Sequence, residues 1–275
     1  MKAILNVSGE FLEALFAILL WPFSGLNPTY TLVIISALFG ILMVSMFGRI
    51  SSQGKILGIK NRIRGNLLGV RLFRHDLGVV FKLQCVILRD TVRYLVLTGL
   101  PLLLLTLPTV LIIGELNLYF GVTPLPVDMS TIVTLKVEDR SSLLPQVSMK
   151  ASKGIVVESP PLRAPGRGEI SWRIRAIQSG QETLIFRIGD RELYKEVQTG
   201  KGWVATSPYR TASVFRWLVS PGEPLLDDDE VALIEIRHSN LELALWGYGF
   251  NWLVLFLVVS VLTGLGLKRF LGVEI

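Results

Sequence analysis

The side chains that most often carry out chemistry in proteins are scarce in this chain of 275 residues. It has one cysteine, Cys85, and two histidines, His75 and His238. One thiol cannot form an intrachain disulfide, and two imidazoles are too few for a histidine zinc cluster. The sequence has no phosphate-binding glycine loop, dinucleotide fingerprint, nucleophile elbow or HExxH zinc motif. We therefore expect no enzyme activity, no catalytic residue, no metal site and no cofactor.

A run of four acidic residues, Asp227–Glu230, is the densest group of oxygen ligands in the sequence. Our first interpretation is a solvated turn. Because hard carboxylate oxygens are the ligands that Ca²⁺ prefers, a calcium site is the alternative.

Positive charge is concentrated in residues 49–94, which hold ten Lys or Arg and two acids, in a chain of net charge +6. A basic block beside apolar segments more often marks the cytoplasmic side of a bilayer than a nucleic-acid site, and we expect no DNA partner. The cations predicted to contact anionic headgroups or a partner are Lys55, Lys60, Arg62, Arg64, Arg71 and Arg74.

Three uncharged apolar segments, residues 29–48, 95–114 and 245–267, are long enough to span a membrane, which takes about 20 residues. The loop between the first two is short and strongly basic, so it should be cytoplasmic. This orientation predicts an N-terminus outside, a long segment 115–244 outside and a C-terminus inside. We therefore expect a protein integral to the plasma (inner) membrane with an extracytoplasmic, or periplasmic, domain.

Residues 1–28 are apolar but contain Glu10 and Glu13, which are unusual in a cleaved signal peptide. A signal peptide stays as the alternative. We favour an interfacial amphipathic helix that lies on the outer surface and leads into the first span.

Residues 49–94 are predicted to form a basic cytoplasmic helical hairpin, broken at Arg74–Gly78. Apolar residues from Ile56 to Val70 recur every three or four positions, and a second run continues into segment 95–114. A stripe of small residues predicts close packing of the hairpin, through Gly54, Gly58, Gly65 and Gly69. The basic charge either fixes topology alone, contacts a partner such as a nascent chain or ribosomal RNA, or senses lipid.

Residues 123–239 alternate apolar and polar side chains over short segments separated by turn residues. Strands are expected at 131–137, 154–159, 170–177, 182–189, 192–197 and 230–238, with a short helix within 209–219. In the third strand, Trp172, Ile174 and Ala176 should face opposite to Arg173 and Arg175. The predicted fold is therefore an integral membrane α-helical protein with three spans plus an extracytoplasmic Ig-like β-sandwich.

The order of these elements resembles the core of the YidC-type insertase superfamily, including its three-span archaeal members and the insertase subunit of the endoplasmic reticulum membrane complex. "LPTVLIIGELNLYFGVTPLPV" (Leu107–Val127) is similar to the second span and exit loop of that subunit, and "VSMFGRISSQ" (Val44–Gln53) to the end of its first span. The resemblance covers residues 8–122 and 240–270. Two features depart from it: Arg49 stands at the end of the first span instead of within it, and the β-domain has a different position from that of the Gram-negative insertase.

The resemblance implies a biogenesis factor that assists insertion or folding of membrane segments through a groove between its spans. Its partners would be the lipid bilayer, nascent membrane proteins and the ribosome. The residues implied for the groove are Ser36, Ser45, Arg49, Arg93, Thr98 and Thr106. Alternatively, these hydroxyls bond their own backbone or a neighbouring helix, and the arginines extend to the interface. The competing function is a membrane-anchored Ig-like protein that binds another envelope protein.

Overall fold

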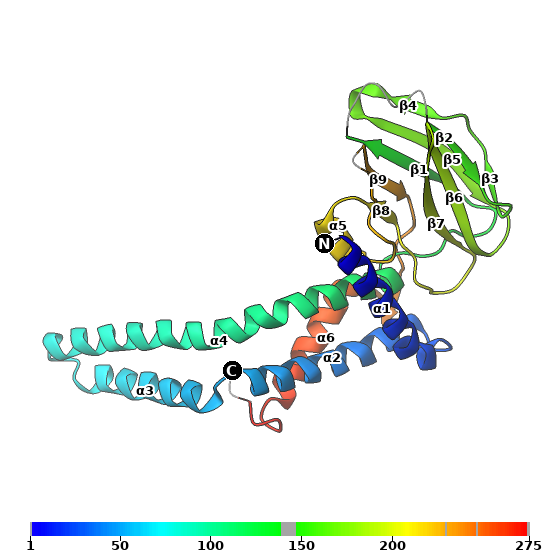
Figure 1. The fold of residues 1–275 in the computed structure, drawn as a ribbon. Coiled ribbons are helices and arrows are strands. Elements are labelled where there is room, and N and C mark those ends of the chain that lie inside the picture. The colour runs from blue at the N-terminus through cyan, green and yellow to red at the C-terminus, as the bar shows by residue number, and fades with distance from the viewer. Residues whose placement is uncertain (1, 139–146, 229, 246, 274–275) are drawn as a thin grey trace. The chain divides into compact units, whose positions relative to one another are not determined.

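The computed structural model describes residues 2–138, 147–228, 230–245 and 247–273, without the side chains of residues 2–5, 7, 8 and 10. The chain divides into two compact units (Figure 1). Unit 1 comprises Met1–Thr31 and Val110–Trp252, and unit 2 comprises Leu32–Thr109 and Leu253–Ile275.

Unit 2 is built from helices α2 (Pro28–Ile50), α3 (Gln53–Leu72), α4 (Leu77–Phe120) and α6 (Trp252–Leu267), of which α2, α4 and α6 begin or end in unit 1. By length and composition, α2 and α4 could each cross a membrane. Helix α6 has 16 residues, which corresponds to a length of about 24 Å.

The predicted start of the third apolar helix at residue 245 is wrong. Strands β10 (Leu243–Leu245) and β11 (Tyr248–Phe250) pair there as a hairpin. Gly247 has a φ of +83°, a conformation that glycine adopts without strain and that allows the tight turn. Leu245 and Tyr248–Phe250 therefore lie in strands instead of in the first turns of a helix.

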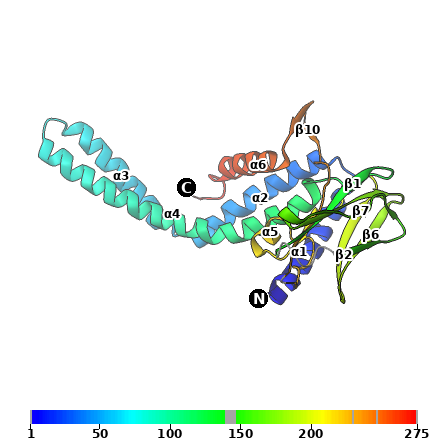
Figure 2. The same cartoon turned by 90° about the horizontal axis from the view of Figure 1, so that it is seen from above.

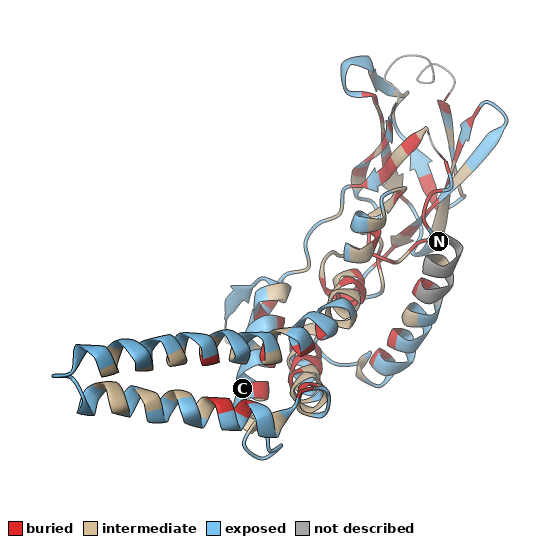
Figure 3. Ribbon diagram, turned by 60° about the vertical axis from the view of Figure 1, so that its left-hand side comes forward, coloured by how far each residue is buried: buried red, intermediate tan, exposed pale blue. Residues whose placement is uncertain are grey.

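The predicted helical hairpin is confirmed as α3 followed by the first half of α4, and Figure 2 shows the two helices side by side. Asp76 caps the start of α4 after the loop that follows α3. Its Oδ1 accepts hydrogen bonds from the backbone N–H groups of Gly78 (3.0 Å) and Val79 (3.1 Å). Ile56 and Ile59 are buried, whereas most of the hairpin is exposed (Figure 3). The thiol of Cys85 lies on this exposed surface of α4.

Unit 1 contains two larger antiparallel sheets. The first has the order β3 (Ile155–Val157), β5 (Glu169–Ala176), β1 (Ser130–Val137), β9 (Val231–Ile236) and β8 (Tyr209–Thr211), and β4 (Leu162–Ala164) also pairs with β5. The second has the order β2 (Val147–Ala151), β6 (Gly180–Ile188) and β7 (Arg191–Thr199). The six predicted strands are confirmed, and β2, β4 and β8 are additional.

One apolar core receives side chains from both of these sheets. In β5 the predicted alternation is confirmed: Trp172, Ile174 and Ala176 are buried. The Trp172 ring meets the Phe186 ring of β6 edge-on, with centroids 5.6 Å apart. The alternation arises because successive side chains of a strand point to opposite faces, so each sheet has one apolar face to bury.

Unit 1 also contains helix α1 (Lys2–Leu20) and the shorter elements η1 (Trp21–Phe23), η3 (Pro165–Arg167) and α5 (Val214–Val219). Helix α1 confirms the helix expected within residues 1–28. It packs through Gly9 against the Trp217 ring, and Asn6 Oδ1 accepts a hydrogen bond of 3.0 Å from the Leu225 backbone N–H. The helix predicted within 209–219 covers only the second half of that segment, because residues 209–211 form β8.

Candidate functional site

A cavity of about 430 Å³ lies among α2, α4 and α6 in unit 2. Its lining is mainly aliphatic and aromatic, and includes Phe39, Met43, Phe47, Leu102, Leu105 and Leu257. Unbranched methionine adapts its shape to different apolar neighbours. The size and lining are those of a site for an apolar side chain cluster or an acyl chain.

Three hydroxyl groups also line this cavity, and each is bonded to its own helix. Thr106 donates to the Leu102 carbonyl (3.0 Å), Thr109 to the Leu105 carbonyl (2.7 Å) and Ser260 to the Leu257 carbonyl (3.0 Å). A hydroxyl that already donates to a carbonyl has no proton left to donate to a guest and offers only its acceptor lone pairs. The cavity therefore favours apolar guests over polar ones.

Of the six residues predicted for a groove, Thr106 lines the cavity and the other five lie elsewhere. Ser36 donates to the Leu32 carbonyl (2.5 Å), Ser45 to that of Ile41 (2.8 Å) and Thr98 to that of Tyr94 (2.8 Å). Arg49 and Arg93 are exposed. For the hydroxyl residues, the alternative interpretation of bonds within each helix is therefore confirmed.

Two glycines that the sequence analysis did not single out bring α2 and α6 together. A side-chain carbon on Gly40 would press against the backbone of Ser260 and would lie 2.6 Å from Thr263 Oγ1. One on Gly264 would lie 2.9 Å from Val44 Cγ2. The absence of side chains at these positions lets the two backbones approach closely, as small residues do between membrane helices.

The predicted glycine stripe of the hairpin is wrong for three of its four members. A side-chain carbon on Gly54, Gly58 or Gly65 would meet nothing within 4 Å, so these glycines face open space. Gly69 differs, because a carbon there would lie 3.1 Å from Leu83 Cδ1 of α4. The buried residues of α3 are instead Ile56 and Ile59, which bury more apolar area than glycine.

Most of the predicted contact cations are exposed, namely Lys55, Arg62, Arg64, Arg71 and Arg74, and Lys60 is half-buried. Asp90 of α4 is fully buried, and its carboxylate lies 3.6 Å from Arg62, 3.6 Å from Arg89 and 3.9 Å from Arg93. One acid thus faces three arginines, and the hairpin keeps a positive surface.

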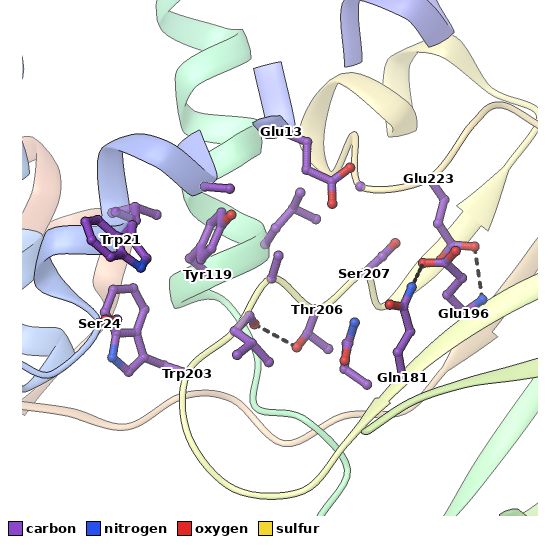
Figure 4. Close-up of a pocket in the computed structure, with 17 residues that line it drawn as sticks. Glu13, Trp21, Ser24, Tyr119, Gln181, Glu196, Trp203, Thr206, Ser207 and Glu223 are labelled. Atoms are coloured by element: carbon purple, nitrogen blue, oxygen red, sulfur yellow. Dashed lines mark hydrogen bonds between the residues drawn. The ribbon is translucent and has the colours of Figure 1, made fainter. Parts of the chain in front are cut away.

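A second cavity, of about 420 Å³, lies in unit 1 among α1, η1, the end of α4 and the β6–β7 sheet. Figure 4 shows Trp21, Tyr119 and Trp203 toward one end, and Glu196 and Glu223 toward the other, with Glu13 directed inward. The Trp203 ring stacks on Phe120, with centroids 5.3 Å apart. These residues come from four distant segments, and no sequence pattern linked them.

A buried ion pair supports the carboxylate end of this second cavity. Lys195 is fully buried, and its Nζ bonds the Glu223 carboxylate, the Glu196 carbonyl (2.9 Å) and the Ser207 carbonyl (2.8 Å). Gln181 Nε2 donates to Glu196 Oε2 (2.8 Å). Nearby, burial and the Lys195 charge lower the pKa of His238 from 6.5 to about 4.

The acidic run Asp227–Glu230 is only partly the solvated turn that the sequence predicts, because Asp227 is exposed whereas Asp228 is not. Asp228 is buried, where its Oδ1 accepts from the Glu230 and Val231 backbone N–H groups (2.9 and 3.1 Å). Its Oδ2 bonds Arg191 (2.9 Å), which also bonds Glu230. Asp229 lies outside the described residues, and among the described ones no group of three metal-ligating side chains occurs. The prediction of a solvated turn is therefore wrong for Asp228, because its buried carboxylate holds the loop through these hydrogen bonds.

Comparisons of the chain with family models, with curated proteins and with solved structures found no match.

Proposed function

We propose that this protein is a membrane protein biogenesis factor of the YidC-like insertase type, which holds an apolar segment of a client between α2, α4 and α6. The cavity of about 430 Å³ among these three helices is the observation that carries the proposal. The protein would act by binding alone, without covalent chemistry.

The character of the cavity suggests which step is assisted. Its hydroxyls are bonded to their own helices and its remaining surface is mostly carbon, so the apolar side chains of a client helix would lose little on entering. Between apolar helices in lipid, association depends on packing and not on a hydrophobic driving force. The cavity offers a client segment packing contacts on only part of its surface. It would therefore bind the segment weakly and release it to a helix that packs against it more closely.

The basic hairpin fits the same proposal. In the proposed topology α3 and the first half of α4 lie in the cytoplasm, where each exposed Lys or Arg near anionic lipid contributes about 1 kcal/mol. Asp90 and two of its arginines, Arg89 and Arg93, stand on the part of α4 that leads into the apolar half of the same helix, and Arg62 reaches Asp90 from α3. The hairpin would bind lipid headgroups or the ribosome and so bring a client to the cavity.

Site-specific photocrosslinking tests this proposal. A photoreactive phenylalanine replaces Leu102 or Leu257, which line the cavity, in the full chain in native membranes. The matched controls are Leu103 on α4 and Leu262 on α6, which are exposed and lie outside the cavity lining. We expect ribosome-bound chains with an apolar segment to crosslink at the two cavity positions and much less at the controls. Equal yields at all four positions, or lipid adducts alone, would refute the proposal.

The alternative is a membrane-anchored protein whose Ig-like β-sandwich binds another envelope protein. The observation that favours it is Leu162 of β4, which is 73% exposed beside Ile132 on the outer face of the larger sheet. An exposed leucine of this kind at a sheet edge suits a protein interface.

A charge placed on this face of the sheet would test whether the protein binds an envelope partner there. Leu162→Asp should abolish co-purification of an envelope partner with the full chain, whereas Ser148→Asp, which adds the same charge to an exposed position of the other sheet, should not. If the partner co-purified equally well with the Leu162→Asp protein, Leu162 would not be part of the docking surface.

A further inference from the structure

The cavity of unit 1 combines two kinds of lining that bind organic cations. Three aromatic rings, those of Trp21, Tyr119 and Trp203, lie toward one end (Figure 4). Trp21 is 77% exposed, although its ring is the largest apolar group of the η1 turn. Electron-rich aromatic faces attract a cation that lies within about 6 Å of the ring.

The other end of the cavity is acidic. Glu13, Glu196 and Glu223 line it, and among the described lining residues none is Lys, Arg or His. The buried Lys195 ammonium beneath the surface neutralises Glu223. Arg210, which is not among the lining residues, interacts electrostatically with Glu196 and Glu223. The charged groups that a guest in the cavity would meet directly are therefore carboxylates, which attract a cation.

The positions of these groups are held by other contacts. Gln181 fixes the Glu196 carboxylate, the Glu196 backbone N–H donates to Glu223 Oε2 (3.3 Å), and Phe120 supports the Trp203 ring. A site whose charged and aromatic groups are already oriented loses less entropy when a ligand binds.

We propose that this cavity binds an organic ammonium ion, with the alkylammonium group between the aromatic rings and the carboxylates. A volume of about 420 Å³ accommodates a group of the size of choline or ethanolamine. The inference is independent of the function proposed for α2, α4 and α6, because every residue that carries it belongs to unit 1.

Calorimetric titration of the full chain in maltoside micelles tests the proposal, in phosphate buffer so that no buffer amine competes. The probe is choline, and its control is 3,3-dimethylbutan-1-ol, which has nearly the same shape but no charge. We expect choline to bind about tenfold more tightly than the neutral alcohol. Equal affinities, or no heat of binding from choline, would overturn the proposal.

Three variants connect the binding to this cavity. Trp21→Leu removes an exposed ring, and Glu196→Gln removes one charge while keeping the shape, so each should weaken choline binding about three- to tenfold. Glu192→Gln is the matched control, because Glu192 lies on the same strand outside the cavity and is bonded to Arg187. A control variant that weakens binding as much as Glu196→Gln would also overturn the proposal.

The source of the ammonium group is distinguished in nanodiscs. If a lipid headgroup occupies the cavity, choline binding should be lost in phosphatidylcholine discs and kept in phosphatidylglycerol discs, which contain no amine. If the ligand comes from solution, choline should bind in both. Either of these two results supports an ammonium site. Loss of choline binding in both kinds of disc would contradict the proposed site.

Discussion

The close approach of α2 and α6 at Gly40 gives the sharpest test of the packing in unit 2. Gly40→Ala would place a methyl carbon against the Ser260 carbonyl and 2.6 Å from Thr263 Oγ1. A backbone carbonyl cannot rotate away as a side chain can, so the helices would have to separate. Gly266→Ala on α6 is the matched control, because its methyl would meet nothing within 4 Å.

The two variants should shift stability in opposite directions. Overpacking costs about 1–3 kcal/mol, and the upper half of this range applies where the obstacle is backbone. Replacing a helical glycine by alanine returns about 1 kcal/mol through helix propensity. We therefore expect Gly40→Ala to lower the free energy of unfolding by about 1–2 kcal/mol, and Gly266→Ala to leave it unchanged or raise it by up to about 1 kcal/mol.

Titration with sodium dodecyl sulfate of the full chain in mixed micelles, followed by intrinsic tryptophan fluorescence, measures both values. Because Ser260 and Gly264 also line the cavity, separation of α2 and α6 should reduce client crosslinking at Leu257 in the Gly40→Ala protein. Equal shifts of the two variants, or a more stable Gly40→Ala protein, would refute the reasoning that these backbones are in contact.

Four further variants test polar contacts. Lys195→Met should cost about 3–5 kcal/mol of unfolding free energy, because it leaves the buried Glu223 carboxylate without its counter-charge, and Lys195→Met/Glu223→Gln should recover part of this loss. Chemical denaturation measures both, and a double variant no more stable than the single one would contradict the pairing. Since the pKa of His238 falls to about 4 on folding, the protein should lose up to about 3 kcal/mol of stability as the pH falls from 6.5 to 4. His238→Gln should lessen this pH dependence, and identical slopes for the two proteins would contradict the shift. Asp76→Ala should cost about 1 kcal/mol at the start of α4 and raise amide exchange about fivefold at Gly78 and Val79, whereas unchanged exchange there would argue against the cap.

Local patterns were sufficient to predict most of the elements. The alternation of Trp172, Arg173 and Ile174 determines which face of β5 is buried, because the period of a strand is two. The break between α3 and α4 could likewise be predicted from Asp76 and Gly78, because a short acidic side chain caps the next helix. Such signals lie within a few residues of the feature that they predict.

The candidate sites could not be predicted in the same way, because they depend on contacts between distant segments. The unit 1 cavity brings together Glu13, Tyr119 and Glu196. Of the residues implied for a polar groove, only Thr106 lines the cavity of unit 2. The serine and threonine hydroxyls donate to carbonyls on the preceding turn of their own helices, so their presence does not mark a polar groove. The glycine stripe failed for a related reason: periodicity identifies a face of a helix but not the partner that covers it.

The exposed Cys85 thiol allows the orientation of the hairpin in a membrane to be determined by chemical labelling. It is the only cysteine in the sequence, and it lies on the arm of the hairpin that runs into the apolar half of α4. A maleimide that cannot cross lipid would modify intact cells only if the hairpin faced outward, and would react with inverted vesicles if it faced the cytoplasm. A single spectroscopic tag at the same atom would then report the approach of a ribosome without any change to the amino-acid sequence.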